Sequence, residues 1–512
     1  MHRLKLLHQT GLLTTKGVIT LITSLSTEGI SLTALLGYSA RRFSERIAVQ
    51  DDRQRMTYAE LYSHTRRLAG ELSNHYQLAR GKKVALCCCN HVELLTALFA
   101  CAGTGADLCL LNVEMSPAQW TKQVEKQCFD LIIHDPELAS RIDDSGYRGA
   151  RLPIGDAPGI GSHQPPSPRK RVAWRAGSIT VLTSGSTGDF KPAARKPSLS
   201  AFLNPLFSLL DTLQLSRYRS LYIATPVYHG FGLATVCLAV LLGATIYLRR
   251  RFDARSSAAL IARHRIEVVT LVPLMLSRMI HGDANSLSSL RCIISGGAHL
   301  SPMLVQETQA RLPDTLFNLY GTSEAGMCLI ATPEDLKRAP DMVGRPVHGL
   351  TLELRDRQSG KMLTGVGERG EIVIQCAWST QGDNIPISTG DLAWRNASGD
   401  YFLCGRIDDM IVSAGENVYP LELEKVLMTH PAVRECLVAG VDDAEFGQRL
   451  KAWVTLKGKT NNVELLAWLK SRVARYLMPV DLQVIDDIPL TAVGKPDVRR
   501  LTNSCRAGRT LS

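Results

Sequence analysis

The feature that most restricts the fold of this chain is a regular alternation of short apolar runs with longer amphipathic segments. Strand-like runs at 47–49, 83–89 and 108–111 alternate with helix-like segments at 58–75 and 92–103. More apolar runs continue the series at 131–134, 220–225, 245–248, 268–272 and 290–295. Strands that alternate with helices favour an α/β fold with parallel strands. We therefore expect mostly parallel sheets, flanked by helices, in a large N-terminal domain.

The chain has 512 residues, too many for one compact core, so two or more domains are expected. After residue 350 the pattern changes to short β-prone segments separated by glycine turns, which predicts a small β-rich subdomain at about 345–404. A new section with two helices and two strands begins near residue 408. The expected organisation is an N-terminal helical segment (1–45), a large domain (46–404), a hinge approach (405–407) and a small α+β C-terminal domain (408–512).

The segment at 12–36 is rich in Leu, Ile and Thr, but Lys16, Glu28 and several hydroxyls interrupt it. It is therefore too polar for a transmembrane helix. A helix packed on the large domain is the favoured interpretation, and an amphipathic helix lying on a membrane stays open.

Charge and cysteine usage limit the class of partner and the compartment. A net charge of +11 suits anionic partners such as nucleotides, CoA or acidic lipids. The basic residues are not clustered with aromatics, which disfavours nucleic acid. None of the 13 cysteines forms a C-x-x-C pair, so reduced thiols in a cytoplasmic protein are expected. A metal at His91, beside the Cys87–Cys89 triplet, is disfavoured relative to a buried strand followed by a helix from about Asn90.

A hydroxyl-rich loop follows the apolar run at 179–182. Its sequence is T-S-G-S-T-G-D-F-K, formed by Thr183, Ser184, Gly185, Ser186, Thr187, Gly188 and three further residues up to Lys191. Small residues expose backbone N–H groups, which together with hydroxyls and a lysine bind anionic oxygens. The spacing differs from that of the Walker loop. The loop indicates a phosphate cradle, although a solvated Ser/Gly linker would have the same composition.

Five more motifs follow this loop along the chain. They contain His229 (Y-H-G-F-G), Gly296, Gly297 and Ala298 (S-G-G-A), Tyr320, Gly321, Thr322 and Glu324 (Y-G-T-S-E), Asp391 (S-T-G-D) and Lys495 (A-V-G-K). Paired glycines let a flat ring lie against the backbone, and a hydroxyl near a carboxylate suits a metal–phosphate contact. Each motif alone is equally compatible with a turn, a helix N-cap or a surface lysine.

In this order and spacing, the motifs resemble the adenylate-forming superfamily, which includes acyl-CoA synthetases, adenylation domains of peptide synthetases and firefly luciferases. The resemblance extends from Thr57 to Leu501. The segments 228–233 and 415–420 are more similar to acyl-CoA synthetases than to amino-acid-activating domains. The whole arrangement most resembles bacterial medium- and long-chain fatty-acyl-CoA ligases.

The resemblance implies a site for ATP and Mg²⁺. The β- and γ-phosphates would lie on the loop from Thr183 to Lys191, and adenine against Gly296, Gly297, Ala298 and Tyr320. The ribose would contact Asp391 and Arg406, and the α-phosphate the segment Gly321–Thr322. Thr183 and Glu324 would contact the metal.

The resemblance also implies the catalytic groups and the second step. His229 would lie beside the incoming carboxylate, and Lys495 would bridge the carboxylate and the phosphate during adenylation. The C-terminal domain would then rotate about Asp408, withdraw the lysine and form a pantetheine channel near Gly415. Mg²⁺ and Lys495 would neutralise the negative charge that develops when one anion attacks another.

The expected function is therefore ATP-dependent activation of a carboxylic acid, a fatty acid on this resemblance, followed by transfer to the CoA thiol. We expect the acyl pocket near His229, residues 272–275 and residues 295–298. One alternative is an enzyme that loads the acyl group onto the phosphopantetheine of a carrier protein. Another is a nucleotide-binding protein without turnover, because Asp189-Phe190-Lys191-Pro192 replaces x-Pro-Lys-Gly and the stretch 376–387 is short. We expect a cytoplasmic location, with peripheral membrane association as an open alternative.

Overall fold

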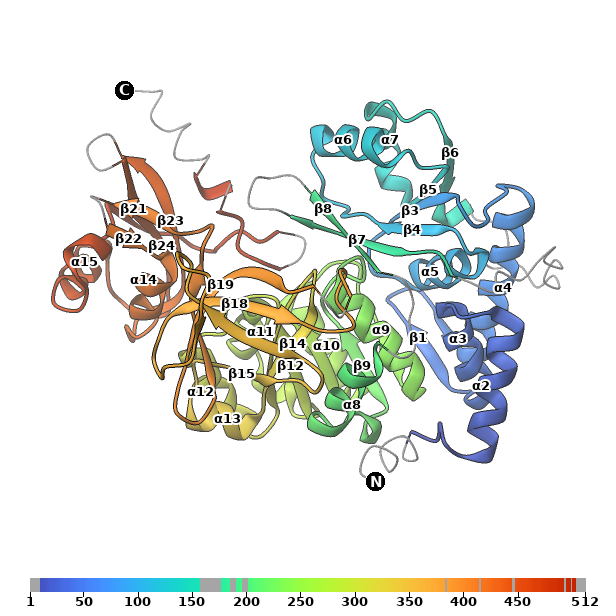
Figure 1. Ribbon diagram of the computed structural model, residues 1–512, viewed down its shortest axis with the longest axis horizontal. Coiled ribbons are helices and arrows are strands. Elements are labelled where there is room, and N and C mark those ends of the chain that lie inside the picture. Colours follow the sequence, from blue (N-terminus) through green and yellow to red (C-terminus); the bar gives the residue numbers. More distant parts are fainter. Residues whose placement is uncertain are drawn as a thin grey trace.

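The computed structural model describes residues 10–156, 176–184, 190–195, 201–382, 385–413, 416–443, 447–491, 494–498 and 500–502. Within these ranges the chain forms a large domain and a smaller C-terminal domain, as Figure 1 shows. The expected class is confirmed: the large domain contains mostly parallel sheets flanked by helices, and the C-terminal domain is α+β.

The first sheet of the large domain has six strands. In spatial order they are β6 (Ala150–Pro153), β5 (Leu131–His134), β3 (Lys83–Cys87), β4 (Asp107–Leu110), β7 (Ile179–Ser184) and β8 (Phe190–Arg195). They run parallel except for the antiparallel pair β7–β8. Parallel neighbours need long crossovers, which α5 (Val92–Thr104) and α6 (Pro117–Gln127) supply.

The second sheet begins as a parallel sheet and continues as an antiparallel one. Its first part, in spatial order, is β2 (Arg55–Thr57), β1 (Ile47–Gln50), β10 (Thr245–Tyr247), β9 (Ser220–Ile223), β11 (Val268–Leu271), β12 (Cys292–Gly296) and β13 (Leu316–Thr322). From β1 to β13 the strands are parallel, and β2 is antiparallel to β1.

The β-rich part of the chain is joined to this second sheet. The order continues with β14 (Gly326–Ala331), β15 (Met342–Pro346), β20 (Tyr401–Arg406), β19 (Ile387–Arg395), β18 (Gly370–Gln375), β16 (Thr351–Arg355) and β17 (Met362–Leu363), all antiparallel. The segment predicted as a β-rich subdomain is thus an antiparallel extension, connected through the β15–β20 pair.

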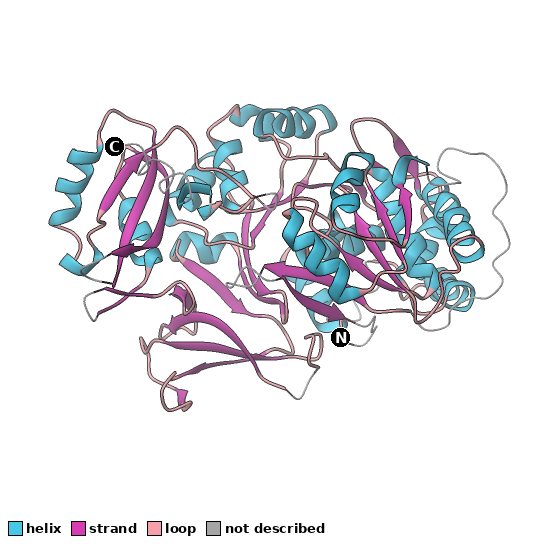
Figure 2. Ribbon diagram, turned by 90° about the horizontal axis from the view of Figure 1, so that it is seen from above, coloured by secondary structure: helices cyan, strands magenta, loops and turns pink. Residues whose placement is uncertain are grey.

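Helices cover these sheets, as Figure 2 shows. The others in the large domain are α2 (Thr15–Glu28), α3 (Leu32–Arg42), α4 (Tyr58–Asn74), α7 (Ala139–Asp144), α8 (Leu203–Thr212), α9 (Gly230–Leu242), α10 (Ala254–His264), α11 (Pro273–Ile280), α12 (Pro302–Arg311) and α13 (Pro333–Arg338), with the 3-10 turns η1 (Pro136–Leu138), η2 (Ile154–Asp156), η3 (Leu215–Arg217) and η4 (Ala284–Leu287). In the described part of the chain, every helix is too short or too polar to cross a membrane.

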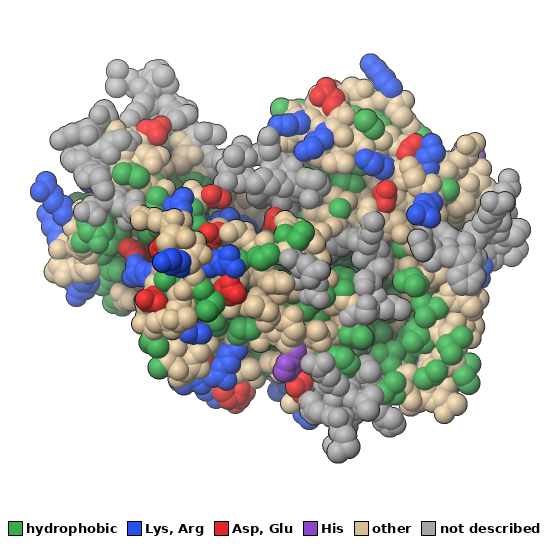
Figure 3. All heavy atoms as spheres, in the orientation of Figure 1, with side chains coloured by type: hydrophobic (Ala, Val, Ile, Leu, Met, Phe, Trp, Pro, Cys, Tyr) green, Lys and Arg blue, Asp and Glu red, His purple; other side chains and the backbone are tan. Residues whose placement is uncertain are grey.

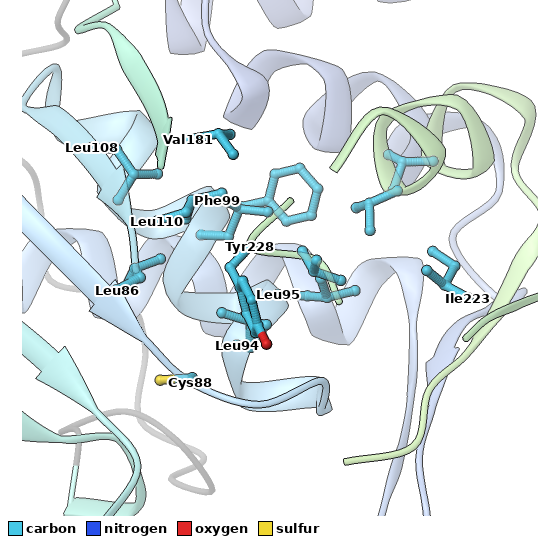
Figure 4. Close-up of a cluster of buried hydrophobic side chains, with 14 of the residues drawn as sticks. Leu86, Cys88, Leu94, Leu95, Phe99, Leu108, Leu110, Val181, Ile223 and Tyr228 are labelled. Carbon is cyan, nitrogen blue, oxygen red and sulfur yellow. The ribbon is translucent and has the colours of Figure 1, made fainter. Parts of the chain in front are cut away.

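The main core lies between the two sheets and is centred on α5. Every residue of α5 except Glu93 is buried, as expected for a helix that is apolar on all sides. Figure 4 shows Phe99 of α5 among Leu108 and Val181 of the first sheet, with Ile223 of the second sheet nearby. This packing fixes the carboxyl ends of β7 and β9 relative to each other.

The cysteine triplet lies at the end of β3, and His91 beside it caps α5. The predicted helix start near Asn90 is close to the observed start at Val92. His91 Nδ1 accepts the N–H of Leu94 at 3.1 Å, and Nε2 lies 2.7 Å from Asp135 Oδ1. Burial alone would lower the pKa of His91, but its bonds to Asp135 and Glu93 raise it. Both ring nitrogens of His91 are therefore bonded to other groups of the protein.

The C-terminal domain has its own sheet. The order is β22 (Glu416–Val418), β21 (Ile411–Ser413), β24 (Gly447–Leu456) and β23 (Val433–Asp443), with β25 (Asp481–Val484) parallel to β24. Its helices are α14 (Pro420–Leu427), α15 (Asn462–Lys470) and the turn η5 (Arg475–Leu477). Helix α15 ends at Lys470, because the N–H groups of Arg472 and Val473 both bond to the carbonyl of Leu469 and close its last turn.

The C-terminal domain docks on α11 and α12 of the large domain. Arg278 pairs with Asp487 at 2.7 Å, and Lys457 pairs with Glu307 at 2.8 Å. Leu274 also packs against the apolar cluster around Trp453. These contacts place the loop that carries Lys495 at the carboxyl ends of β11 and β12.

Candidate active site

A single cavity of about 2230 Å³ brings most of the predicted site residues together. It lies at the carboxyl ends of the parallel strands, where open α/β sheets bind ligands. Its lining includes His229, Gly296, Gly297, Ala298, Tyr320, Gly321, Thr322, Glu324, Asp391, Arg406, Asp408 and Lys495. Small-molecule pockets usually measure about 300–1,000 Å³, so this cavity has room for two ligands.

The predicted phosphate loop is described only at its two ends. Thr183 and Ser184 end β7, and Lys191 lies on β8, with Thr183 directly opposite Lys191 in the antiparallel register. Residues 185–189, and with them Gly185, Ser186, Thr187 and Gly188, lie outside the described residues, as does Gly415. The β7–β8 hairpin thus holds both ends of this loop side by side.

Asp391 is held in a fixed orientation by two partners. It lies on β19, opposite Arg406 of β20, and not in the turn that was the alternative interpretation. Tyr320 donates its hydroxyl to Asp391 Oδ2 at 2.6 Å, and Arg406 Nη1 lies 3.2 Å from Oδ1. Burial raises the pKa of Asp391, while Tyr320 and Arg406 oppose that shift. A carboxylate positioned in this way suits a pair of ribose hydroxyls.

Lys495 enters the cavity from a tight turn in the C-terminal domain. The turn is closed by the N–H of Thr491, which donates to the carbonyl of Lys495 at 2.8 Å. Gly494 has a φ of +74°, and a Cβ there would lie 2.5 Å from Met275 Cε and 2.8 Å from Val272 Cγ2. Only glycine therefore lets this turn approach α11 so closely.

The side chain of Lys495 lies beside the predicted nucleotide residues. A Cβ at Gly297, whose φ is +79°, would be 3.9 Å from Lys495 Cε. Loss of water and the guanidinium of Arg406 lower the pKa of Lys495, and Asp391 opposes them. In this domain orientation the lysine therefore lies inside the cavity, beside Gly297 and Arg406.

His229 lies where the nucleotide residues give way to an apolar region. It is the N-cap residue of α9, and its Nε2 is buried without a hydrogen-bond partner among the described residues. Burial, with the charge of Lys495, lowers the pKa of His229 to about 3. The imidazole is thus neutral at ordinary pH. An unpaired buried nitrogen costs about 1–3 kcal/mol, which a bound oxygen atom would remove.

The rest of the cavity is apolar. Its lining residues between positions 12 and 272 include no Lys, Arg, Asp or Glu, and they come largely from α2, α3, α8 and α9. On α9, which is roughly 20 Å long, the cavity-lining residues include Phe231, Ala234, Cys237, Leu238 and Leu241. This surface is only partly buried, although it is apolar.

Two parts of this site were not predicted from the sequence: the apolar wall along α2, α3 and α8, and Glu424. Sequence reasoning expected the acyl pocket only near His229, 272–275 and 295–298, and not along α2, α3 and α8. The available signal was the absence of charge from residue 230 to residue 242, which is unusual for a helix at a surface. The same reasoning also missed Glu424 of α14, which accepts the N–H of Val438 at 2.8 Å and whose pKa is raised by burial to about 7.

Comparison with known proteins gives matches along most of the chain. The model of the AMP-binding enzyme family matches residues 36–382, and that of the AMP-binding enzyme C-terminal domain matches residues 422–495. The 2-succinylbenzoate–CoA ligase of Bacillus velezensis is 27% identical over 91% of this chain and 96% of that protein. The enzyme of the same name from Bacillus subtilis is 28% identical over 91% of this chain and 96% of its own.

Solved structures are similar over the same extent. The o-succinylbenzoate CoA synthetase of Bacillus subtilis, in complex with its acyl-adenylate intermediate, has a TM-score of 0.78 at 25% identity, over 91% of this chain and 97% of that one. The same enzyme with ATP and a magnesium ion has a TM-score of 0.77 at 25% identity, over 91% of this chain and 99% of that one.

Proposed function

Since this chain belongs to the AMP-binding enzyme family, we propose that it activates a fatty acid with ATP and transfers the acyl group to the thiol of CoA. The adenylate-forming superfamily expected from the motifs is confirmed, and so is the enzyme class, an AMP-forming acid–thiol ligase. The expected ATP, Mg²⁺ and CoA agree with relatives that are CoA ligases and bind ATP, magnesium or AMP.

The first step joins two anions. A carboxylate oxygen attacks the α-phosphorus of ATP, the bond to the β-phosphate oxygen breaks, and pyrophosphate leaves. Lys495 is the cation placed where this charge develops, and removing one such contact typically costs about 3–4 kcal/mol. His229 offers a neutral N–H to the carboxylate, and Asp391 holds the ribose. Glu324 and Thr183 would hold Mg²⁺, which when bound neutralises phosphate charge.

The second step transfers the acyl group. The thiol of CoA loses its proton to solvent, and its sulfur attacks the acyl carbon. The bond between that carbon and the AMP oxygen breaks, and AMP leaves with the negative charge. Asp408 is the second residue after the end of β20, and its Oδ2 lies 3.5 Å from Arg406 Nη2. This position at the junction of the two domains supports the proposed hinge, because hinges lie at element ends between packed bodies.

The observation that carries the choice of a fatty acid is the uncharged acyl region. Its described lining holds no cation between residues 12 and 272. Burying a carboxylate without a partner costs several kcal/mol. A monocarboxylate with an alkyl chain places its single charge near Lys495 and the rest in apolar surroundings. A dicarboxylate would leave its second charge without a partner there.

A second candidate substrate is 2-succinylbenzoate, the acid named in the relatives described above. Its two carboxylates require two separate cationic contacts. The fatty acid is favoured because the described acyl wall supplies none.

Pyrophosphate exchange tests these assignments. Labelled pyrophosphate is incubated with enzyme, ATP, Mg²⁺ and one acid at a time: hexadecanoate, hexanoate, benzoate or 2-succinylbenzoate. We expect exchange with hexadecanoate at the highest kcat/KM. Preference for 2-succinylbenzoate would contradict the substrate, and silence with every acid would favour a binding protein without turnover.

The acceptor is tested separately. The enzyme is loaded with ATP and the preferred acid, and then given either CoA or a holo acyl carrier protein. We expect the thioester to form on CoA. Transfer to the carrier protein alone would identify the acceptor as phosphopantetheine on a protein.

A further inference from the structure

Helix α2 exposes apolar side chains to solvent and buries polar ones, unlike an ordinary surface helix. Its buried residues are Gly17, Thr20, Ser24 and Glu28, whereas Val18, Ile19 and Ile22 are exposed. The exposed fractions of Ile19 and Ile22 are 60% and 62%. Surface helices normally bury their apolar side.

The buried hydroxyls of α2 need no solvent. Thr20 donates to the carbonyl of Lys16 at 2.7 Å, and Ser24 donates to that of Thr20 at 2.8 Å. Glu28 accepts the hydroxyl of Tyr62 at 2.6 Å. The buried polar side chains of α2 thus have protein partners. The outward side exposes the apolar residues Val18, Ile19 and Ile22, together with the small hydroxyl residues Thr15, Thr23 and Ser26.

The apolar half of the cavity reaches the surface beside this face. Ile30, Phe202 and Leu203 line the cavity and are also 45%, 41% and 41% exposed. Leu21 and Leu25, on the inner side of α2, line it as well. Figure 3 shows hydrophobic side chains gathered over this part of the surface, at the lower right. The cavity therefore has an apolar mouth between α2 and α8.

The sequence before Glu28 carries charge of one sign. From residue 1 to residue 27 the sequence contains three basic residues, Arg3, Lys5 and Lys16, and no Asp or Glu. On the exposed side of α2, Lys16 is the only charged residue. Apolar side chains flanked by lysine or arginine, with no acids, match the interface of an anionic bilayer.

We propose that the outer face of α2, formed by Val18, Ile19 and Ile22, docks together with Leu13 just before the helix on an anionic phospholipid bilayer. The mouth at Ile30, Phe202 and Leu203 then opens toward the lipid. A long-chain acid then enters the cavity from the bilayer, carboxylate first, and its chain follows along α9. This entry route rests on the proposed fatty-acid function. The docking itself rests on the surface alone.

The test uses the full chain and a pair of substitutions that adds two negative charges, Ile19→Glu with Ile22→Glu. Neither residue lines the cavity, so activity on an acid dissolved in buffer is expected to stay unchanged. The matched control is Val366→Glu with Val463→Glu. It adds the same two charges at valines far from α2 in the sequence, which are 63% and 69% exposed. A neutral pair, Ile19→Ser with Ile22→Ser, removes the apolar surface without adding charge.

Co-sedimentation is measured with vesicles of phosphatidylcholine mixed with phosphatidylglycerol, and with phosphatidylcholine alone. We expect wild type and control to bind the anionic vesicles, and both isoleucine pairs to bind at least roughly tenfold more weakly, because each pair removes two apolar side chains from the contact with lipid. Pyrophosphate exchange with vesicle-embedded hexadecanoate should fall in parallel, and exchange with dissolved hexanoate should not change.

Three results would overturn the docking. The first is that wild type does not bind anionic vesicles, and the second is that the isoleucine pairs bind them as tightly as wild type. The third is a wild-type dimer that the glutamate pair converts to a monomer, which would identify a second copy of the chain as the occupant of this face. A failure of the proposed function is distinguishable, because exchange would then be absent with every acid while vesicle binding persisted.

Discussion

The two halves of the cavity are built on different principles. The half with the predicted nucleotide residues is formed by strand ends and turns: Gly296 at the end of β12, Gly297 after it, Tyr320 on β13, Asp391 on β19 and Lys495 in a closed turn. The acyl half is formed by the sides of α2, α3, α8 and α9. Hydrogen-bonded ladders fix individual atoms, as in the paired register of Asp391 and Arg406, whereas helix sides enclose a volume. The first arrangement suits a ligand held by directed hydrogen bonds and charges, and the second suits a ligand recognised by its size and apolar surface.

The largest expected effect tests whether the nucleotide half acts through one charge. We expect Lys495→Ala to lower the rate of acyl-adenylate formation by ~10²–10³, with much less effect on thioester formation from added acyl-adenylate and CoA. Pyrophosphate exchange and single-turnover thioester assays measure the two steps. Lys459→Ala, at an exposed lysine of the same domain, should behave as wild type. Equal loss in both steps would show that the lysine serves more than adenylation.

The next effect concerns orientation in the same half. We expect Asp391→Ala to raise the KM for ATP by ~10–10², because hydrogen bonds to a charged group contribute about 1.5–3 kcal/mol. Tyr320→Phe removes one partner of Asp391 and should raise that KM by less. The KM for the acid should change little in either variant. A dominant change in the acid KM would contradict the division of the cavity.

A smaller effect is expected in the acyl half, from Cys237→Phe on α9. The added ring occupies volume and removes no specific contact, so kcat/KM for hexadecanoate should fall by roughly 10–200-fold. The kcat/KM for hexanoate should change less, which makes this acid the internal control. Pyrophosphate exchange with both acids gives the ratio. If both acids lose activity equally, α9 does not line the path of the alkyl chain.

The smallest effect is a pH dependence of stability at Glu424, a buried residue of α14 that lines the cavity. Its folded pKa is raised by burial to about 7, above the unfolded value, so the carboxyl favours folding at low pH and this contribution is lost as the pH rises through 7. We expect Glu424→Gln, which keeps an acceptor for Val438, to stabilise the protein at pH 8 by on the order of 1–2 kcal/mol and to change little at pH 5. Urea unfolding at the two pH values measures this. A constant difference at both pH values would contradict it.

The same division explains what could be predicted from the sequence. Strand ends place their residues next to each other in the chain, so motifs such as Y-G-T-S-E around Tyr320 are visible as short strings. The ladder pair of Asp391 with Arg406 was not predictable in this way, because it depends on the register in which β19 and β20 align. The parallel sheets were predictable, since each buried strand is a short apolar run.

The acyl wall was not predictable, because its helices come from positions 15–28, 32–42, 203–212 and 230–242 and carry no local motif. An apolar side that lines a cavity has the same composition as one that packs in a core. The exposure of Ile19 and Ile22 was hidden for a related reason: the sequence shows that α2 is amphipathic, but not which face turns inward.

The contact of Gly494 with Val272 and Met275 has a consequence for the order of events. While that turn is seated, the ammonium group of Lys495 fills space next to Gly297, and no thiol can occupy the same volume. In the proposed mechanism, ATP cleavage and thioester synthesis would therefore exclude each other in time, because the thiol could approach only after the turn lifts. The close approach of Gly494 to α11 would then separate two reactions that share one cavity.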